Sequence, residues 1–313
     1  MRGRRGTAVA SALLALLAAA GCGLGPGADV GDVRLTVTRE YGQVPVVETT
    51  VAAKESDTVM RVLEGEADVS TRYGGGFVHA IDGTAEDNRG GDPYDWFFYV
   101  DGEESEIGAA DYDVEGRERI WWDYRNWSAV NHIPEVVGSW PAPFKAGIGG
   151  ERHPVEVECL ESRGSLRTAG DRKEPRNCVL VRGVLEREGV KVAAGTPDKA
   201  LRILVGPWSR VRRDPVARLV EDGPVESGVF ADFEGGGLLA LDEKGEVAED
   251  LGPEGGLVAA TSRFGGLPVW VVTGATPAAV RGAAESLQPD LLRNHYAIAS
   301  TGALVYPLPL EKP

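Results

Sequence analysis

The spacing of the apolar residues changes along the chain, and this change limits the folds that the sequence can adopt. In Val33–Thr38 and again in Val44–Ala52, apolar and polar side chains alternate, which predicts half-buried strands. From about residue 154 onward, strands of the buried type alternate with helical segments, which is typical of an α/β sheet. The sequence therefore predicts an α+β domain followed by an α/β domain.

One helix and three further strands complete the first predicted domain. Ser56-Asp57-Thr58 predicts a helix start before the apolar run Val59–Leu63. The three strands are expected at Phe77–Ile81, Trp96–Val100 and Arg119–Tyr124, with a polar loop at 87–95.

In the second predicted domain, a strand at Val155–Leu160 precedes a helix at 177–188, which Gly189 ends. Further strands are expected at 200–207, 228–233, 238–241, 257–261, 268–274 and 296–299, and further helices at 214–220 and 278–287. Each strand–glycine–helix junction leaves free backbone N–H groups that could bind an anion, and the candidates are Gly206–Ser209 and Thr273–Thr276.

The N-terminus carries the marks of a cleavable export signal. Three arginines precede the uncharged run Ala8–Ala20, which is shorter than the roughly 20 apolar residues that span a bilayer. Ala19-Ala20-Gly21-Cys22 resembles the lipobox of bacterial lipoproteins, which implies removal of residues 1–21 and lipidation of Cys22. A plain secretory signal followed by an incidental cysteine is the alternative.

The lipobox predicts that the protein lies on the extracytoplasmic face of the cell membrane, held by lipid through a flexible tether at 22–31. The net charge of −15 disfavours nucleic acid as a partner, because phosphates would be repelled. Cys159 and Cys178 are the remaining cysteines, and an oxidising compartment favours a disulfide between them. A disulfide that closes this loop of about 20 residues would add about 3 kcal/mol to the free energy of unfolding. Buried or metal-binding thiols are the alternative.

Residues 33–127 resemble the family of transcobalamin C-terminal-like domains. The segments that carry the resemblance are Val78–Gly83, Trp96–Gly102, Gly108–Val114 and Arg119–Tyr124. The resemblance implies a β-grasp-like fold for the first domain. In the animal members this domain contacts cobalamin beside a helical barrel, which the second half of this sequence does not resemble.

Aromatic residues are dense in the last strands of the first domain. Rigid aromatic side chains give a large contact area at little entropic cost, so they are typical of ligand and partner surfaces. The residues expected to bind a ligand are Trp96, Tyr99, Trp122, Tyr124 and Trp127. Coverage of these rings by the Pro- and Gly-rich linker at 128–153 is the alternative.

No catalytic residues, cofactor or metal site are predicted, because the histidines lack metal-ligand spacing and no serine lies in a nucleophile elbow. The acidic segment 86–95 departs from the spacing of a calcium loop. The sequence therefore predicts a non-enzymatic lipoprotein that binds a small ligand, a corrinoid or another cofactor, as an accessory to a transporter. The alternatives are an adhesion or scaffolding module that binds a protein or polysaccharide, and an envelope hydrolase without a recognisable motif.

We expect the Cys22→Ser variant to leave the membrane fraction, because it lacks the thiol that takes the lipid. Fractionation of cells that express each form is the measurement. A variant that stays in membranes as tightly as the wild type would show that Cys22 is not the anchor.

Overall fold

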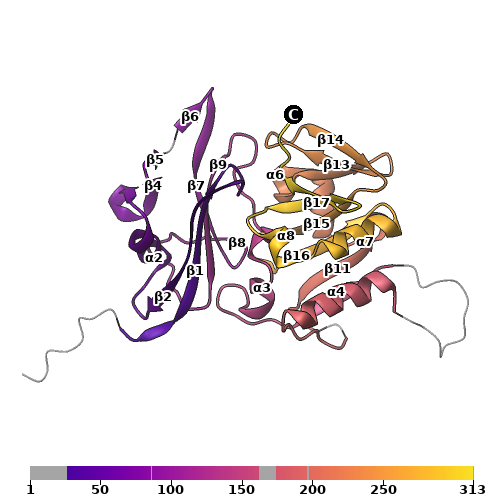
Figure 1. Ribbon diagram of the computed structural model, residues 1–313, viewed down its shortest axis with the longest axis horizontal. Helices are drawn as coiled ribbons and strands as arrows, with labels where there is room; N and C mark the ends of the chain where they lie inside the picture. Colours follow the sequence, from indigo (N-terminus) through magenta and orange to yellow (C-terminus); the bar gives the residue numbers. More distant parts are fainter. Residues whose placement is uncertain (1–26, 86, 162–173, 196, 313) are drawn as a thin grey trace, which may run out of the picture.

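The computed structural model describes residues 27–85, 87–161, 174–195 and 197–312. Cys22 and the expected signal at 1–21 lie outside the described residues. The protein is a mixed α/β chain, richer in strand than in helix, and its two large sheets stand side by side (Figure 1). In the described ranges no helix has the length and apolar character needed to cross a bilayer.

The first sheet has the strand order β2-β1-β9-β7-β6, with β8 paired to β7. β1 and β9 run parallel, and the other neighbouring strands run antiparallel. Alternation along β1 places Val33, Leu35 and Val37 in one core, on the side of α2 (Val59–Glu66). The strands are β1 (Asp29–Arg39), β2 (Val44–Lys54), β6 (Asp87–Arg89), β7 (Asp92–Val100), β8 (Glu103–Glu104) and β9 (Arg119–Asn126).

Thr58 begins α2 as predicted, because its side chain accepts a hydrogen bond from the backbone N–H of Arg61. A small antiparallel sheet follows α2 and includes two strands that were not predicted. It comprises β3 (Val69–Arg72), β4 (Phe77–Ile81) and β5 (Thr84–Ala85), with a 3-10 turn, η2 (Tyr73–Gly75), between the first two.

Two expectations for the first domain are wrong. The polar loop predicted at 87–95 is the β6–β7 hairpin, which turns at Gly90-Gly91, where both glycines have positive φ. Pro93 is tolerated there because it lies at the start of β7, with its backbone directed past the end of β9, where its carbonyl accepts from the N–H of Trp127. The tether predicted to reach Gly31 is shorter, since β1 begins at Asp29 and pairs with β2 from that residue.

The second sheet has the order β10-β11-β16-β15-β17-β18. Its first three strands are parallel and the remaining pairs are antiparallel. Its strands are β10 (Val155–Cys159), β11 (Leu201–Pro207), β15 (Gly256–Thr261), β16 (Val269–Gly274), β17 (Ala297–Thr301) and β18 (Leu304–Leu308). The strand β18 follows the one expected at 296–299 and is not among the predicted strands.

The two faces of the second sheet are covered differently. α4 (Arg176–Arg187) and α7 (Pro277–Glu285) pack on one face, with α8 (Pro289–Leu292) beside them (Figure 1). The other face meets shorter elements, which are α5 (Trp208–Val211), η4 (Ala217–Asp222), α6 (Pro224–Ser227), β12 (Ala231–Glu234), β13 (Gly237–Leu241) and β14 (Val247–Gly252). The helix expected at 214–220 is a 3-10 segment instead, and the side chain of Asp214 caps its start by accepting from the N–H groups of Val216 and Ala217.

The predicted disulfide joins Cys159 to Cys178, with 5.9 Å between the two Cα atoms. It ties the end of β10 to the first turn of α4. Residues 162–173 lie between these elements and are outside the described part of the chain.

The segment at 128–153, predicted to be a linker that packs against the protein, is largely buried. It contains η3 (Val137–Ser139) and α3 (Ala142–Lys145). The rings of Trp140 and Phe144 pack on Trp270 of β16, with centroids 5.5 and 5.1 Å away. The segment therefore extends the core of the second sheet.

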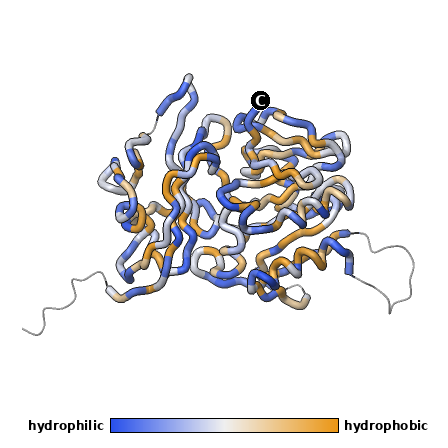
Figure 2. The backbone as a smooth tube through the Cα atoms, viewed as in Figure 1, coloured by the Kyte–Doolittle hydropathy of each residue, from blue (hydrophilic) through white to orange (hydrophobic). Residues whose placement is uncertain are grey.

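One continuous core joins the two sheets. Tyr296, just before β17, packs its ring against Tyr41, Tyr99 and Trp121 of the first sheet, at centroid distances of 5.1 to 5.6 Å. A Cβ atom on Gly42 would lie 1.8 Å from the carbonyl oxygen of Asn294, so only glycine permits this approach. Figure 2 shows hydrophobic residues concentrated in the strands of both sheets.

The buried turn after β7 generates a pH prediction. Asp101 has φ +52° and its carboxylate accepts a hydrogen bond from the backbone N–H of Arg119. Burial raises the pKa of the Asp101 carboxyl to about 7, and the charge of Glu118 adds to this rise. Between its ordinary pKa and this raised pKa, the folded state holds a proton that the unfolded state has lost. The free energy of unfolding therefore falls as pH rises through that window.

The difference in stability between Asp101→Asn and the wild type should favour the variant more at pH 8 than at pH 4. Asparagine keeps the acceptor and tolerates positive φ, but it does not ionise. Urea denaturation at both pH values is the measurement. The control is Asp82→Asn, in the exposed Asp82-Gly83 turn, which makes the same change at positive φ without burial. Equal pH dependence in both variants would contradict the prediction.

Candidate functional site

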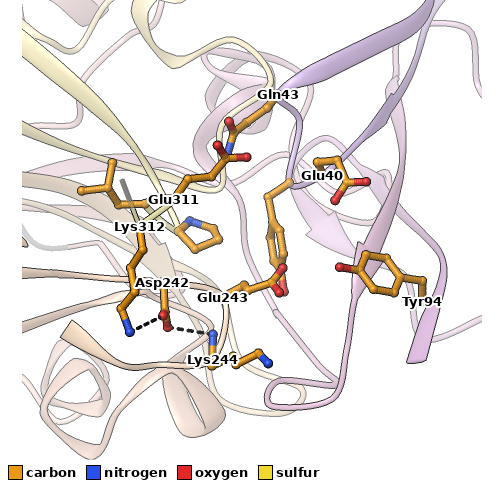
Figure 3. Close-up of a pocket in the computed structure, with 11 residues that line it drawn as sticks. Glu40, Gln43, Tyr94, Asp242, Glu243, Lys244, Glu311 and Lys312 are labelled. Carbon is orange, nitrogen blue, oxygen red and sulfur yellow. Dashed lines mark hydrogen bonds and ion pairs between the residues drawn. The ribbon is translucent and has the colours of Figure 1, made fainter. Parts of the chain in front are cut away.

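A cleft of about 380 Å³ opens where the first sheet meets the second. Its lining comes from the turn after β1, from β7, from the β13–β14 turn and from the segment after β18. Figure 3 shows Glu40, Gln43 and Tyr94 around one side and Asp242, Glu243 and Lys312 around the other. This volume falls within the range of small-molecule sites, which also tend to lie between domains.

The wall from the first sheet is a turn in an uncommon backbone conformation. Glu40, Tyr41 and Gly42 have φ values of +57°, +56° and +84° in succession. The hydroxyl of Tyr41 donates to the carbonyl of Asn126 at 2.7 Å, and the backbone N–H of Gly42 donates to Asp123 at 3.0 Å. Non-glycine residues at positive φ persist only where surrounding contacts fix them, and they cluster at ligand sites.

Arg89 holds the rim of this wall. Its guanidinium pairs with Glu40 at 2.9 Å and lies over the rings of Tyr94 and Tyr124, at 4.8 and 5.2 Å from their centroids. These contacts neutralise Glu40 and orient the Tyr94 ring beside the cleft.

The wall from the second sheet is built by Asp242. Its Oδ1 accepts from the backbone N–H groups of Lys244 and Glu246, and its Oδ2 pairs with Lys312 at 2.8 Å. Burial acts to raise the pKa of Asp242, but the hydrogen bonds from Lys312 and from the two backbone groups outweigh it and lower the pKa. Asp242 therefore stabilises the β13–β14 turn and holds Lys312 in an ion pair.

Glu243 and Glu311 are the carboxylates of the cleft that form no ion pair in the described part of the chain, and Glu243 is the more buried of the two. The lining carries four carboxylates and two lysines, and both lysines are paired, Lys312 with Asp242 and Lys244 with Asp92. Glu243 is half-buried, accepts from Asn126 Nδ2 at 2.8 Å and has no ion pair in the described part of the chain. Burial raises the pKa of Glu243; the hydrogen bond from Asn126 opposes the rise, and the charge of Glu40 adds to it.

The aromatic residues predicted to bind a ligand do not form this cleft. Trp96, Tyr99, Trp122 and Tyr124 are buried, so their rings contact protein, and their expected place on a binding surface is wrong. Three of them pack in the core on the α2 side, and Tyr99 packs toward Tyr296. Strand alternation explains the error, because both faces of this sheet are covered. Trp127 is 38% exposed and lies outside the cleft lining.

At the two predicted anion sites, the junctions contact neighbouring protein groups. The Thr273 hydroxyl donates to the carbonyl of Gly206 at 2.8 Å, which ties the two junctions together. A Cβ on Gly274 would lie 2.5 Å from Ala279, so the backbone there is packed against α7. In the ranges that the structure describes, no three His, Cys, Asp or Glu side chains are placed to hold a metal ion.

No motif in the sequence marks this cleft, because its walls come from segments about 200 residues apart. Tyr94 was grouped with the polar loop, and Asp242–Lys244 reads as an ordinary charged turn. Only the approach of the sheets brings them together.

Residues 56–126 match the model of a family described as a domain of unknown function, DUF4430. This range overlaps the segment that resembles the transcobalamin family but does not confirm that family. No curated protein matches the chain significantly. One similar solved structure is a candidate metal binding protein from Ruminococcus gnavus ATCC 29149, which is 16% identical. The similarity covers 31% of this chain and 97% of that chain, and its TM-score of 0.24 is too low to support a fold or a function.

We expect Trp122→Ala to lower the free energy of unfolding by roughly 3–5 kcal/mol, because Trp122 is 2% exposed and stacks on Phe98. The matched control, Trp127→Ala, should change it by roughly 0.5 kcal/mol or less. Chemical denaturation measures both. A stable Trp122→Ala variant that loses ligand binding would restore the original prediction.

Proposed function

We propose that the protein is a non-enzymatic, lipid-anchored binding protein on the extracytoplasmic face of the cell membrane. Its ligand is a small molecule with a positively charged group, held in the cleft between the two sheets. The export signal and lipobox support the location, and the cleft supports the binding role.

The observation that carries the ligand class is the unpaired carboxylate of Glu243. A half-buried carboxylate with a single hydrogen bond gains a strong partner when a ligand supplies an ammonium or guanidinium group. Tyr94 on the opposite wall carries a hydroxyl that can accept a hydrogen bond from the same kind of group. The acidic surface of the whole protein also favours the approach of cations.

The size of the cleft narrows the choice further. A corrinoid, one of the ligands proposed from sequence, is far larger than a cleft of about 380 Å³ and would not be enclosed. Small amines and guanidines fit this space. Lipid anchoring would keep such a ligand next to a membrane transporter, in the accessory role predicted from sequence.

We expect Glu243→Gln to weaken the binding of small cations at least tenfold, since it removes the unpaired charge while keeping the shape of the side chain. Calorimetric titration of the detergent-solubilised full chain with choline, spermidine and L-arginine amide is the measurement. Binding to the wild type should weaken as pH falls, and at a higher pH than for an ordinary glutamate, because protonation removes the charge and the pKa of Glu243 is raised.

Glu246→Gln is the matched control, because Glu246 is not part of the cleft lining, although it pairs with Lys312, and the same charge is lost. Equal loss in both variants would point to general electrostatics instead of a site. Failure of every probe to bind the wild type would reject the proposal in favour of the adhesion or scaffolding role.

A further inference from the structure

A second, more open groove of about 780 Å³ runs along another part of the junction between the two sheets. The first sheet contributes Glu103 of β8 and the nearby Glu106, and the connecting segment contributes its portion at 148–153. The second sheet contributes Glu156 of β10 and the positively charged residues Lys199, Arg202 and Arg263. The groove shares no lining residue with the cleft at Glu243.

Glu156 is the unusual group in this groove. It is 8% exposed, its Oε2 is shielded and has no hydrogen-bond partner, and it takes part in no ion pair within the described ranges. A buried carboxylate is normally paired or hydrogen-bonded, because loss of hydration costs several kcal/mol otherwise. No group of the described chain forms a hydrogen bond with this oxygen.

The cations near Glu156 are engaged elsewhere. Arg202 is its neighbour in the parallel register of β10 and β11, yet the Arg202 guanidinium pairs with Glu158 at 2.8 Å and Asp214 at 2.6 Å. Arg263 donates to the carbonyl of Pro215 at 3.0 Å. Arg202 and Arg263 therefore form their contacts with groups other than Glu156, although both arginines line the same groove as Glu156.

The acidic side of the groove extends behind β8. The backbone of Glu103 forms an antiparallel β-bridge with that of Glu135, whose side chain is 3% exposed and whose Oε1 has no partner. Burial raises the pKa of Glu103, and the charge of Glu106 adds to the rise. Unsatisfied carboxyl oxygens thus occur at the groove and directly behind it, whereas Lys199 and Arg263 give the lining positive charge as well.

We propose that this groove is a second binding site, which takes the ammonium group of an amino acid or dipeptide at Glu156 and its carboxylate at Lys199 and Arg263. A zwitterion matches a lining that carries both signs of charge. Its ammonium group would form the ion pair that Glu156 lacks within the described chain. The carboxylates here do not converge as a metal-binding group within the described chain, so an organic cation fits the groove better than a metal ion.

Calorimetric titration of the full chain with L-alanyl-L-alanine tests the site, with N-acetyl-L-alanyl-L-alanine and L-alanyl-L-alanine amide as probes that lack one charge each. The free dipeptide should bind at least tenfold more tightly than either blocked form. Equal binding of the three probes, or no binding of the dipeptide to the wild type, would overturn the proposal.

Glu156→Gln should reduce dipeptide binding at least tenfold and leave the Tm unchanged or higher, because it removes an unpaired buried charge while keeping the shape. The same titrations in the Glu243→Gln background remove ammonium binding at the first cleft, and the preference for the free dipeptide should persist there, so failure here is distinguishable from failure of the cation site. Lys199→Gln should weaken binding of the free dipeptide but not of its amide. A Glu156→Gln variant that binds normally with a lower Tm would show that Glu156 is structural, and the proposal would fall.

Discussion

The insertion of Tyr296 against the first sheet is the contact on which the arrangement of this protein depends. Its ring meets three aromatic rings of that sheet, and its hydroxyl donates to Asp123 Oδ2 at 3.0 Å. Large aromatic contacts of this kind dominate the energetics of buried interfaces. Because the Tyr296 hydroxyl must also reach Asp123 for its hydrogen bond, the contact fixes the orientation of the two sheets as well as their proximity. The two sheets therefore share a core and act as the fixed walls of both grooves.

The polar groups around Tyr296 are mostly satisfied. Asp123 also accepts from the Thr38 hydroxyl at 2.5 Å, and that hydroxyl accepts from Trp121 Nε1 at 2.7 Å. Arg125, which is fully buried, donates to the carbonyl oxygens of Val130 and Asn131 and lies over the ring of Phe97. Burial raises the pKa of Asp123, and its hydrogen bonds oppose the rise. A buried network of this kind is stabilising only when its members are paired, so it specifies one alignment of the sheets.

Against this background, the two carboxylates at the edges of the interface differ from their neighbours. Glu243 has one hydrogen bond, and Glu156 has none in the described chain. Natural proteins keep such destabilising groups where function uses them, and pairing by a ligand recovers the cost of burial. The interface thus combines an interior in which most polar atoms are paired, with Tyr99 Oη and Arg125 Nε as exceptions, and carboxylates at its edges that lack an ion pair in the described chain.

Local features could be predicted from the sequence: the alternating strand β1, the Thr58 cap of α2, the strand–helix order of the second unit and the pairing of Cys159 with Cys178. These depend on neighbouring residues, or on a small number of cysteines in an oxidising compartment. Sequence patterning could not decide which face of an aromatic strand meets solvent, because Trp121 and Trp122 point to opposite sides of a sheet that is covered on both. The docking of the two sheets places Tyr94 across the cleft from Glu243 and leaves Glu156 without a partner in the described chain. Contacts between distant segments follow from the docking of whole sheets, and no local pattern records that docking.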